Sequence, residues 1–253
     1  MSALVNTSVK DGIMTINMNR PDKKNALNLE MYEALGEAIN SAGNNPDINV
    51  IVLSGAGDSF CAGNDLKDFI LNPPKGEDSP VVKFLTAISE AKLPIVAAVQ
   101  GAAVGVGTTM LLHCDFVYIA DNAKLSLPFV DLGLVPEAAA SMLLPRLAGH
   151  QKAAELLMLG EPFTPQVALD IGLATAVCKP EDLEATAMKT AAKLAAKPRT
   201  ALLETKSLLR REFETVAQRI EAEGEVFKKC LASPDAQKAL AAMLMKKKGP
   251  KTP

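Results

Sequence analysis

Two short stretches near the start of the chain have the apolar pattern of β-strands. Leu4–Val9 and Ile13–Met18 flank Asp11-Gly12, which is a strong signal for a tight hairpin turn. The spacing then becomes helical, and Asn28 is a good N-cap for the helix that follows. Apolar positions on the inner face of this predicted helix are Met31, Leu35, Ala38 and Ala42.

Two continuous apolar runs come next, Ile48–Leu53 and Pro94–Val99, and each is typical of a strand that is buried on both faces. A third predicted strand covers Asp115–Ala120. The first two runs lead into glycine-containing segments that open helices, which indicates a strand–turn–helix plan repeated along a parallel sheet. The pattern therefore predicts an α/β fold.

From Glu137 onward the spacing is mostly helical. Predicted helices cover Ala138–Leu147, Gln151–Leu159, Pro165–Ile171 and Pro180–Ala196, and two or three more lie within Arg199–Lys248. Within this final stretch a single helical face is apolar, and its residues are Val216, Ile220, Phe227 and Leu231.

Composition narrows the functional classes. The net charge of -2 gives no sign of a basic face, although it leaves a local basic patch open, and eight Phe, two Tyr and no Trp leave few platforms for stacking bases, so we expect no nucleic-acid partner. Four widely spaced Cys and two His lack the spacing of a structural zinc site, so we expect no metal. No signal peptide and no membrane-length apolar stretch is recognisable, and these features favour a cytoplasmic protein without a membrane partner.

Two segments, Ser59–Leu66 and Gly101–Gly107, carry the candidate chemistry. Each follows a predicted buried strand and leads into a helix, where main-chain N–H groups have no internal partner. Two such segments side by side would direct two N–H donors at one oxygen and form an oxyanion hole. Tight packing of a strand against a helix explains the same glycines, so the pattern alone leaves both interpretations open.

Several motifs in a fixed order resemble the enoyl-CoA hydratase/isomerase (crotonase) superfamily over nearly the whole chain. They are Arg20-Pro21, Lys24-Asn25-Ala26-Leu27, Phe60–Leu66, Gly101-x-x-x-Gly105-x-Gly107, Asp131–Pro136 and Ala168-x-x-x-Gly172-Leu173-Ala174. The resemblance implies a spiral of ββα repeats over residues 1–195 and a helical trimerisation region over 196–253. It also implies a homotrimer or a hexamer, and an acyl-CoA thioester as substrate, with CoA as part of that substrate and no separate cofactor.

The same resemblance assigns the site residues. The oxyanion donors are the N–H groups of Asn64 and Val106, and the segments around them contact substrate. Ala62, Asn64 and Leu66 line the path of adenine and pantetheine, and Lys24 and Ala26 lie where CoA enters. The remaining substrate-binding residues expected are Gly63, Asp65, Gly105, Thr109 and Phe129.

The pattern of carboxylates favours one branch of the superfamily. The hydratases hold water with two glutamates, and the corresponding positions here are Thr109 and Phe129. Glu137 instead resembles the single catalytic glutamate of the Δ3,Δ2-enoyl-CoA isomerases of fatty-acid β-oxidation. Apolar neighbours would raise the pKa of Glu137 and help it to carry a proton.

Other interpretations remain at this point. Pro136 fits the first position of a helix, so Glu137 could merely stabilise a helix start, where the dipole would lower its pKa. Asp65 is expected to cap the helix that begins near Leu66 rather than to react. A hydratase with a different base, and an acyl-CoA-binding protein without activity, are the alternative functions.

Overall fold

The computed structural model describes residues 2–73, 76, 78–211 and 215–246, and side chains as far as residue 240. The chain divides into two compact units, Met1–Ala192 and Lys193–Pro253, and the division falls inside helix α8 (Leu183–Ala195). The first unit contains all the predicted site residues. The trimerisation role of residues 196–253 stays a prediction, and residues 247–253 of that region lie outside the described residues.

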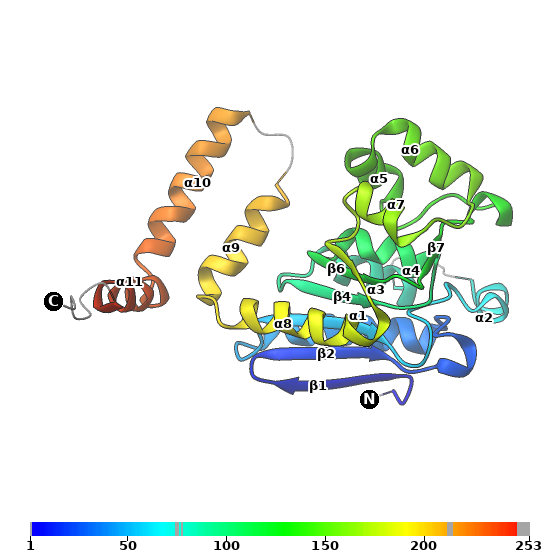
Figure 1. Cartoon of the computed structure of the whole chain (residues 1–253), viewed down its shortest axis with the longest axis horizontal. Coiled ribbons are helices and arrows are strands. Elements are labelled where there is room, and N and C mark those ends of the chain that lie inside the picture. Colours follow the sequence, from blue (N-terminus) through cyan, green and yellow to red (C-terminus); the bar gives the residue numbers. More distant parts are fainter. Residues whose placement is uncertain (1, 74–75, 77, 212–214, 247–253) are drawn as a thin grey trace. The chain divides into compact units, whose positions relative to one another are not determined.

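A six-stranded sheet forms the centre of the first unit (Figure 1). The strands lie in the order β1-β2-β3-β4-β6-β8, and only β1 and β2 pair antiparallel. The predicted hairpin and the three predicted apolar strands are confirmed, while β8 was not predicted. The bounds are β1 Val5–Lys10, β2 Ile13–Met18, β3 Val50–Gly55, β4 Ile95–Val99, β6 Phe116–Ala120 and β8 Ala176–Cys178.

A second, two-stranded parallel sheet pairs β5 (Ala102–Val104) with β7 (Lys124–Ser126). An isolated parallel bridge from Cys61 to Ala103 extends it on one side. Successive turns of the chain therefore pass first through the large sheet and then through the small one, which is the repeated plan that the sequence predicts. The segment Gly101–Gly107 is not a plain loop, because three of its residues form β5.

Helices α1 (Leu29–Asn44) and α3 (Pro80–Ser89) pack closely against each other. A Cβ at Gly36 of α1 would lie 3.4 Å from the Cα of Phe84, so a larger side chain there would press on the α3 backbone. The predicted N-cap is confirmed, because the Asn28 side chain accepts a hydrogen bond from Met31 N at 3.0 Å. This cap fixes the start of α1 beside the candidate site.

The other helices that begin in the first unit are short except α8, which has 13 residues. They are α2 Leu66–Leu71, α4 Val106–Thr109, α5 Ala140–Ala148, α6 His150–Ala154, α7 Pro165–Asp170 and α8. The predicted helix 151–159 ends differently, because α6 passes into a π-helical turn over Glu155–Leu159. The predicted helix start at Ala138 is wrong, because α5 begins at Ala140.

The second unit consists, over its described residues, of α9 (Arg199–Leu209), α10 (Val216–Leu231) and α11 (Pro234–Lys246). The apolar face predicted on α10 is present and exposed, with Ile220 64% and Phe227 68% accessible. None of the helices over the described residues is both long and apolar enough to cross a membrane. The same residues contain no cluster of three His, Cys, Asp or Glu side chains suited to a metal ion.

Candidate active site

The first glycine-containing segment, Cys61–Asp65, is held by the chain that leads into α1. Leu27 N donates to Gly63 O, and Asp65 N donates to Leu27 O, both at 2.8 Å. These two bonds flank Asn64, which pairs with Leu27 in a parallel bridge but uses neither of its own main-chain groups in it. Within the described range of the chain, the Asn64 N–H has no acceptor. It is therefore available to a ligand.

The second segment lies directly beside the first one. Cys61 N donates to Ala102 O, and Val104 N donates to Cys61 O, each at 2.9 Å. Helix α4 begins at Val106, whose N–H also has no acceptor among the residues that the structure describes. The two segments thus bring together two unpaired main-chain donors, which is the arrangement that an oxyanion hole needs.

The glycines serve two different purposes. A Cβ at Gly107 would lie 2.3 Å from Cys61 O, and one at Gly63 would lie 3.0 Å from Val104 O. At these two positions the interpretation as tight packing is correct. Gly105 has open space around it, but its φ of +54° belongs to a conformation that side chains disfavour. Gly105 therefore sets the direction of the Val106 amide.

A cavity of about 290 Å³ opens between the two segments and the chain around Phe129. Seven of the predicted residues line it, namely Ala62, Gly63, Asn64, Leu66, Gly105, Val106 and Phe129. Six lining residues were not predicted as site residues, namely Phe69, Val104, Pro128, Asp131, Leu132 and Leu134. Most of the wall is apolar, which suits an acyl chain. A larger cavity of about 540 Å³ elsewhere in the first unit contains no predicted site residue.

The side chain of Glu137 is held by Thr109. The Thr109 hydroxyl donates to Oε1 of Glu137, and Thr109 is the last residue of α4, one helical turn after Val106. Glu137 is not among the residues that line the cavity, but the contact with Thr109 fixes its carboxyl to the helix that carries the second amide donor. Burial raises the pKa of Glu137, and the Thr109 hydrogen bond opposes part of that effect.

The interpretation of Glu137 as a helix-start residue is wrong. Ala138 and Ala139 both have positive φ angles, +52° and +56°, so the chain turns sharply before α5 begins. Each such angle costs a residue with a side chain about 1–2 kcal/mol. The Ala138 carbonyl accepts a hydrogen bond from His113 Nε2 at 2.9 Å, which helps to hold the turn. The carboxyl is consequently directed to Thr109 rather than to a helix N-terminus.

Neither of the two positions of the hydratase glutamates carries an acid. Thr109 is fully buried and acts as a donor to Glu137, and Phe129 is 6% exposed in the cavity wall. The arrangement therefore contains one carboxyl that is positioned by the α4 helix, not a pair that could hold a water molecule between them.

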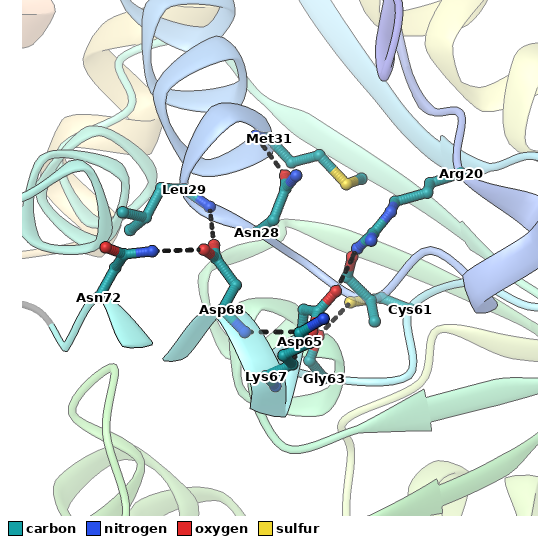
Figure 2. Close-up of polar contacts among 11 residues, drawn as sticks. Arg20, Asn28, Leu29, Met31, Cys61, Gly63, Asp65, Lys67, Asp68 and Asn72 are labelled. Atoms are coloured by element: carbon teal, nitrogen blue, oxygen red, sulfur yellow. Dashed lines mark hydrogen bonds and ion pairs between the residues drawn. The ribbon is translucent and has the colours of Figure 1, made fainter. Parts of the chain in front are cut away.

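Asp65 has a structural task, as its predicted capping role requires (Figure 2). Its carboxylate accepts from Lys67 N and Asp68 N at the start of α2 and pairs with Arg20 Nη1 at 2.8 Å. The bond from Arg20 is the main reason why the pKa of Asp65 lies below its usual range. Asp65 does not line the cavity.

Lys24 and Ala26 flank the loop through their backbones. Ala62 N donates to Lys24 O at 2.9 Å, and the Ala26 carbonyl accepts from Arg20 Nη1 at 3.0 Å. The Lys24 side chain is exposed. Neither residue lines the cavity, so their predicted contact with CoA would have to lie outside it.

Two buried side chains next to the loop complete the site. The Tyr32 hydroxyl of α1 donates a hydrogen bond to Asn64 Oδ1 at 2.5 Å. Tyr32 was not predicted as a site residue, because in the sequence it resembles the other buried positions of the apolar helix face. Burial raises the pKa of Cys61 to about 12, so its thiol stays protonated and packs as an apolar group, as predicted.

Comparison with known proteins agrees with this site. The model of the family described as enoyl-CoA hydratase/isomerase matches residues 8–251. The 1,2-epoxyphenylacetyl-CoA isomerase of Escherichia coli K12 is 31% identical over 98% of this chain and 97% of its own. Human enoyl-CoA delta isomerase 2 is 36% identical over 87% of this chain, which spans 57% of that protein. A solved structure from Magnetospirillum magneticum AMB-1, described as a candidate enoyl-CoA hydratase/carnithine racemase, is 46% identical with a TM-score of 0.94, over 97% of both chains.

Proposed function

The chain belongs to the enoyl-CoA hydratase/isomerase family and has its fold, and on that premise we propose that it is a Δ3,Δ2-enoyl-CoA isomerase of fatty-acid β-oxidation. The substrate is a 3-enoyl-CoA thioester, and the product has its double bond in conjugation with the carbonyl. Glu137 is the base and the acid, and the N–H groups of Asn64 and Val106 bind the thioester oxygen.

The contact between Thr109 and Glu137 is the observation that carries this proposal. It ties the one carboxyl at α4 to the helix that begins with a free amide donor, at a position where a hydratase would need a second carboxylate. A single base suffices for a double-bond shift, because the proton that leaves C2 returns to C4 and no water is consumed. Hydration would require a second group to activate water.

The reaction passes through an enolate whose charge lies on the thioester oxygen. Two fixed amide donors stabilise this charge, and the loss of one such donor typically costs about 3 kcal/mol of transition-state stabilisation. The raised pKa of Glu137 reduces the difference in proton affinity between the carboxylate and the enolate. Both features act on the same step, the removal of the C2 proton.

Substrate binding follows from the same arrangement. The apolar wall of the cavity, including Leu66 and Phe129, takes the part of the acyl chain near the thioester. Ala62 and Asn64 lie at the loop that CoA would cross, and Lys24 and Ala26 are close to that loop through their backbones. We propose the homotrimer, or a pair of trimers, as the working assembly.

Turnover of 3-hexenoyl-CoA by the wild type and by Glu137→Gln tests the proposal, followed by the absorbance of the conjugated product. We expect the variant to lose at least about a hundredfold in kcat, since general-base catalysis is typically worth that much. Asp131→Asn is the matched comparison, because Asp131 is the carboxylate in the cavity wall itself. If Asp131→Asn abolished turnover and Glu137→Gln did not, the assignment of the base would be wrong.

Two further measurements separate the alternatives. Crotonyl-CoA distinguishes a hydratase, because only a hydratase consumes the conjugated double bond. Exchange of the C2 hydrogen into deuterated water, measured on a saturated thioester, distinguishes a protein that binds acyl-CoA without chemistry. We expect no hydration of crotonyl-CoA and Glu137-dependent exchange.

A further inference from the structure

The hydroxyl of Tyr32 lies 2.5 Å from Oδ1 of Asn64, at the loop that supplies one of the two free amides. Tyr32 is 2% exposed, and its ring packs edge-on against Phe84 with the ring centroids 5.5 Å apart. The ring is therefore fixed between α1 and α3, and its hydroxyl is directed at the loop. Nothing in the sequence motifs assigns Tyr32 a role.

Among the residues that the structure describes, the backbone around Asn64 is anchored at its two neighbours, Gly63 and Asp65. Leu27 binds Gly63 O and Asp65 N, and over the described residues these bonds leave the Asn64 N–H without an acceptor, as the proposed oxyanion role requires. The bond from Tyr32 is the side-chain anchor that the structure gives this residue. A residue that must keep its N–H free for a ligand is thus oriented through its side chain instead.

The start of α1 also contacts α2, the helix that follows this loop (Figure 2). Leu29 N donates to Asp68 Oδ2 at 2.8 Å, and Asn28 caps the helix. Tyr32 follows Asn28 by four positions, so one turn of α1 holds both α2 and the loop. Movement of this helix end would therefore move the Asn64 amide.

We propose that Tyr32 is a positioning residue that holds the Asn64 amide at the oxyanion hole through the Asn64 side chain. The inference rests on the proposed function for the oxyanion role of Asn64. Burial keeps the pKa of Tyr32 well above its ordinary value of 10.0, and the nearby Glu137 and Cys61 add to this effect. The hydroxyl is consequently a permanent donor and not a proton carrier.

Replacement of Tyr32 by Phe removes this bond and keeps the ring. Because the amide acts on the developing negative charge more than on the ground-state carbonyl, we expect kcat to fall about three- to tenfold with KM nearly unchanged. Tyr118→Phe is the matched control, since Tyr118 is the other tyrosine of the chain. Its hydroxyl contacts Thr190 Oγ1 at 2.7 Å, and neither residue lines the candidate cavity.

A spectroscopic measurement separates positioning from simple loss of stability. Bound 2,4-hexadienoyl-CoA absorbs at longer wavelength when hydrogen bonds polarise its carbonyl. We expect a red shift with the wild type and with Tyr118→Phe, and a smaller shift with Tyr32→Phe. Asn64→Ala removes the acceptor, so adding Tyr32→Phe to Asn64→Ala should cause no further loss.

Each outcome decides a different point. An unchanged red shift in Tyr32→Phe, or a rise in KM alone, overturns the positioning role, even if the variant unfolds at lower temperature. A wild type that shows the shift but does not isomerise 3-hexenoyl-CoA refutes the isomerase proposal and leaves the role of Tyr32 in place. A wild type without any shift refutes both.

Discussion

The Thr109 hydroxyl donates a hydrogen bond to the Glu137 carboxyl, joining α4 to a chain segment 28 residues further on. The bond favours the charged carboxylate and opposes the effect of burial on the pKa of Glu137. In a hydratase the position of Thr109 would hold a reacting carboxylate. Here Thr109 carries a hydroxyl that orients the Glu137 carboxyl, which is the base in the proposed reaction.

Thr109→Val should move the acidic limb of the activity profile to higher pH. The reaction needs Glu137 as the carboxylate, and without the hydroxyl the raised pKa of Glu137 rises further. At the low-pH end of the profile we expect kcat of the variant to be about two- to tenfold lower than that of the wild type. The measurement is kcat for 3-hexenoyl-CoA from pH 5 to 9. Thr108→Val is the control, because that hydroxyl contacts Ala103 O and not Glu137, and it should leave the limb in place.

Glu137→Gln should raise the stability of the protein at neutral pH. The pKa of Glu137 in the folded chain lies above its ordinary value of 4.5. At pH values between the ordinary pKa and the raised pKa, the folded state therefore binds more protons than the unfolded state. Stability is therefore lost as the pH rises through this window. The neutral amide avoids that cost and can still accept from Thr109.

Urea unfolding at two pH values measures this effect. The gain should be present at pH 8 and absent below pH 4, where the carboxyl is protonated in both states. Glu161→Gln, at an exposed carboxylate, is the matched control and should show no such gain. A destabilised Glu137→Gln at pH 8 would contradict the expected cost of burial.

Gly107→Ala should displace α4 and so lower both stability and activity. The added Cβ would lie 2.3 Å from Cys61 O, which is backbone, so α4 must move away from the first segment. We expect a loss of about 1–3 kcal/mol in stability and at least about tenfold lower kcat, because the two amides separate. Gly43→Ala near the end of α1 meets nothing within 4 Å and should be neutral or stabilising in chemical unfolding. Equal activity of the two variants would contradict the expected displacement.

The elements of the fold with strong local signals could be predicted from the sequence. Asp11-Gly12 predicted the turn of the first hairpin. The strand β4 was recognisable because all its residues are apolar, and the structure buries every one of them. The strands β5 and β7 have only three residues each, too few for any periodic pattern, and they bond with each other and with distant parts of the chain, at Cys61 and Phe163. Such pairing depends on the arrangement of the whole sheet.

The candidate site was predictable in its motifs and not in its contacts. The absence of acids at Thr109 and Phe129 was visible, but the bond between Thr109 and Glu137 depends on two left-handed alanines that no propensity favours. The same alanines explain why the helix that was predicted to begin at Ala138 begins at Ala140. Tyr32 could not be recognised, because only the packing of α1 beside the loop gives its hydroxyl a partner.

Phe227→Asp should dissociate the proposed assembly. The α10 side chains Ile220 and Phe227 are largely exposed in the single chain, and burial of such a side chain against a second copy is worth about 1.5–3 kcal/mol. A charge at that position would have to be desolvated. Sedimentation should show a smaller species than the wild type, whereas Glu225→Ala should change nothing, since it affects only an exposed ion pair with Lys228. An unchanged oligomer in Phe227→Asp would exclude this face from the interface.

Phe69→Ala should shift the substrate preference toward longer acyl chains. Phe69 lines the cavity from α2, one helical turn after Leu66, so its removal extends the apolar space where the acyl chain is proposed to lie. Each methylene that such a pocket accepts or rejects is worth about 1–3 kcal/mol, so the ratio of kcat/KM for a ten-carbon over a six-carbon 3-enoyl thioester should rise about tenfold or more. Ile70→Ala is the matched control, because Ile70 is the next residue of α2 but is 76% exposed and does not line the cavity. A parallel decline of kcat/KM for both thioesters in Phe69→Ala would show that α2 supports the site without setting the chain length.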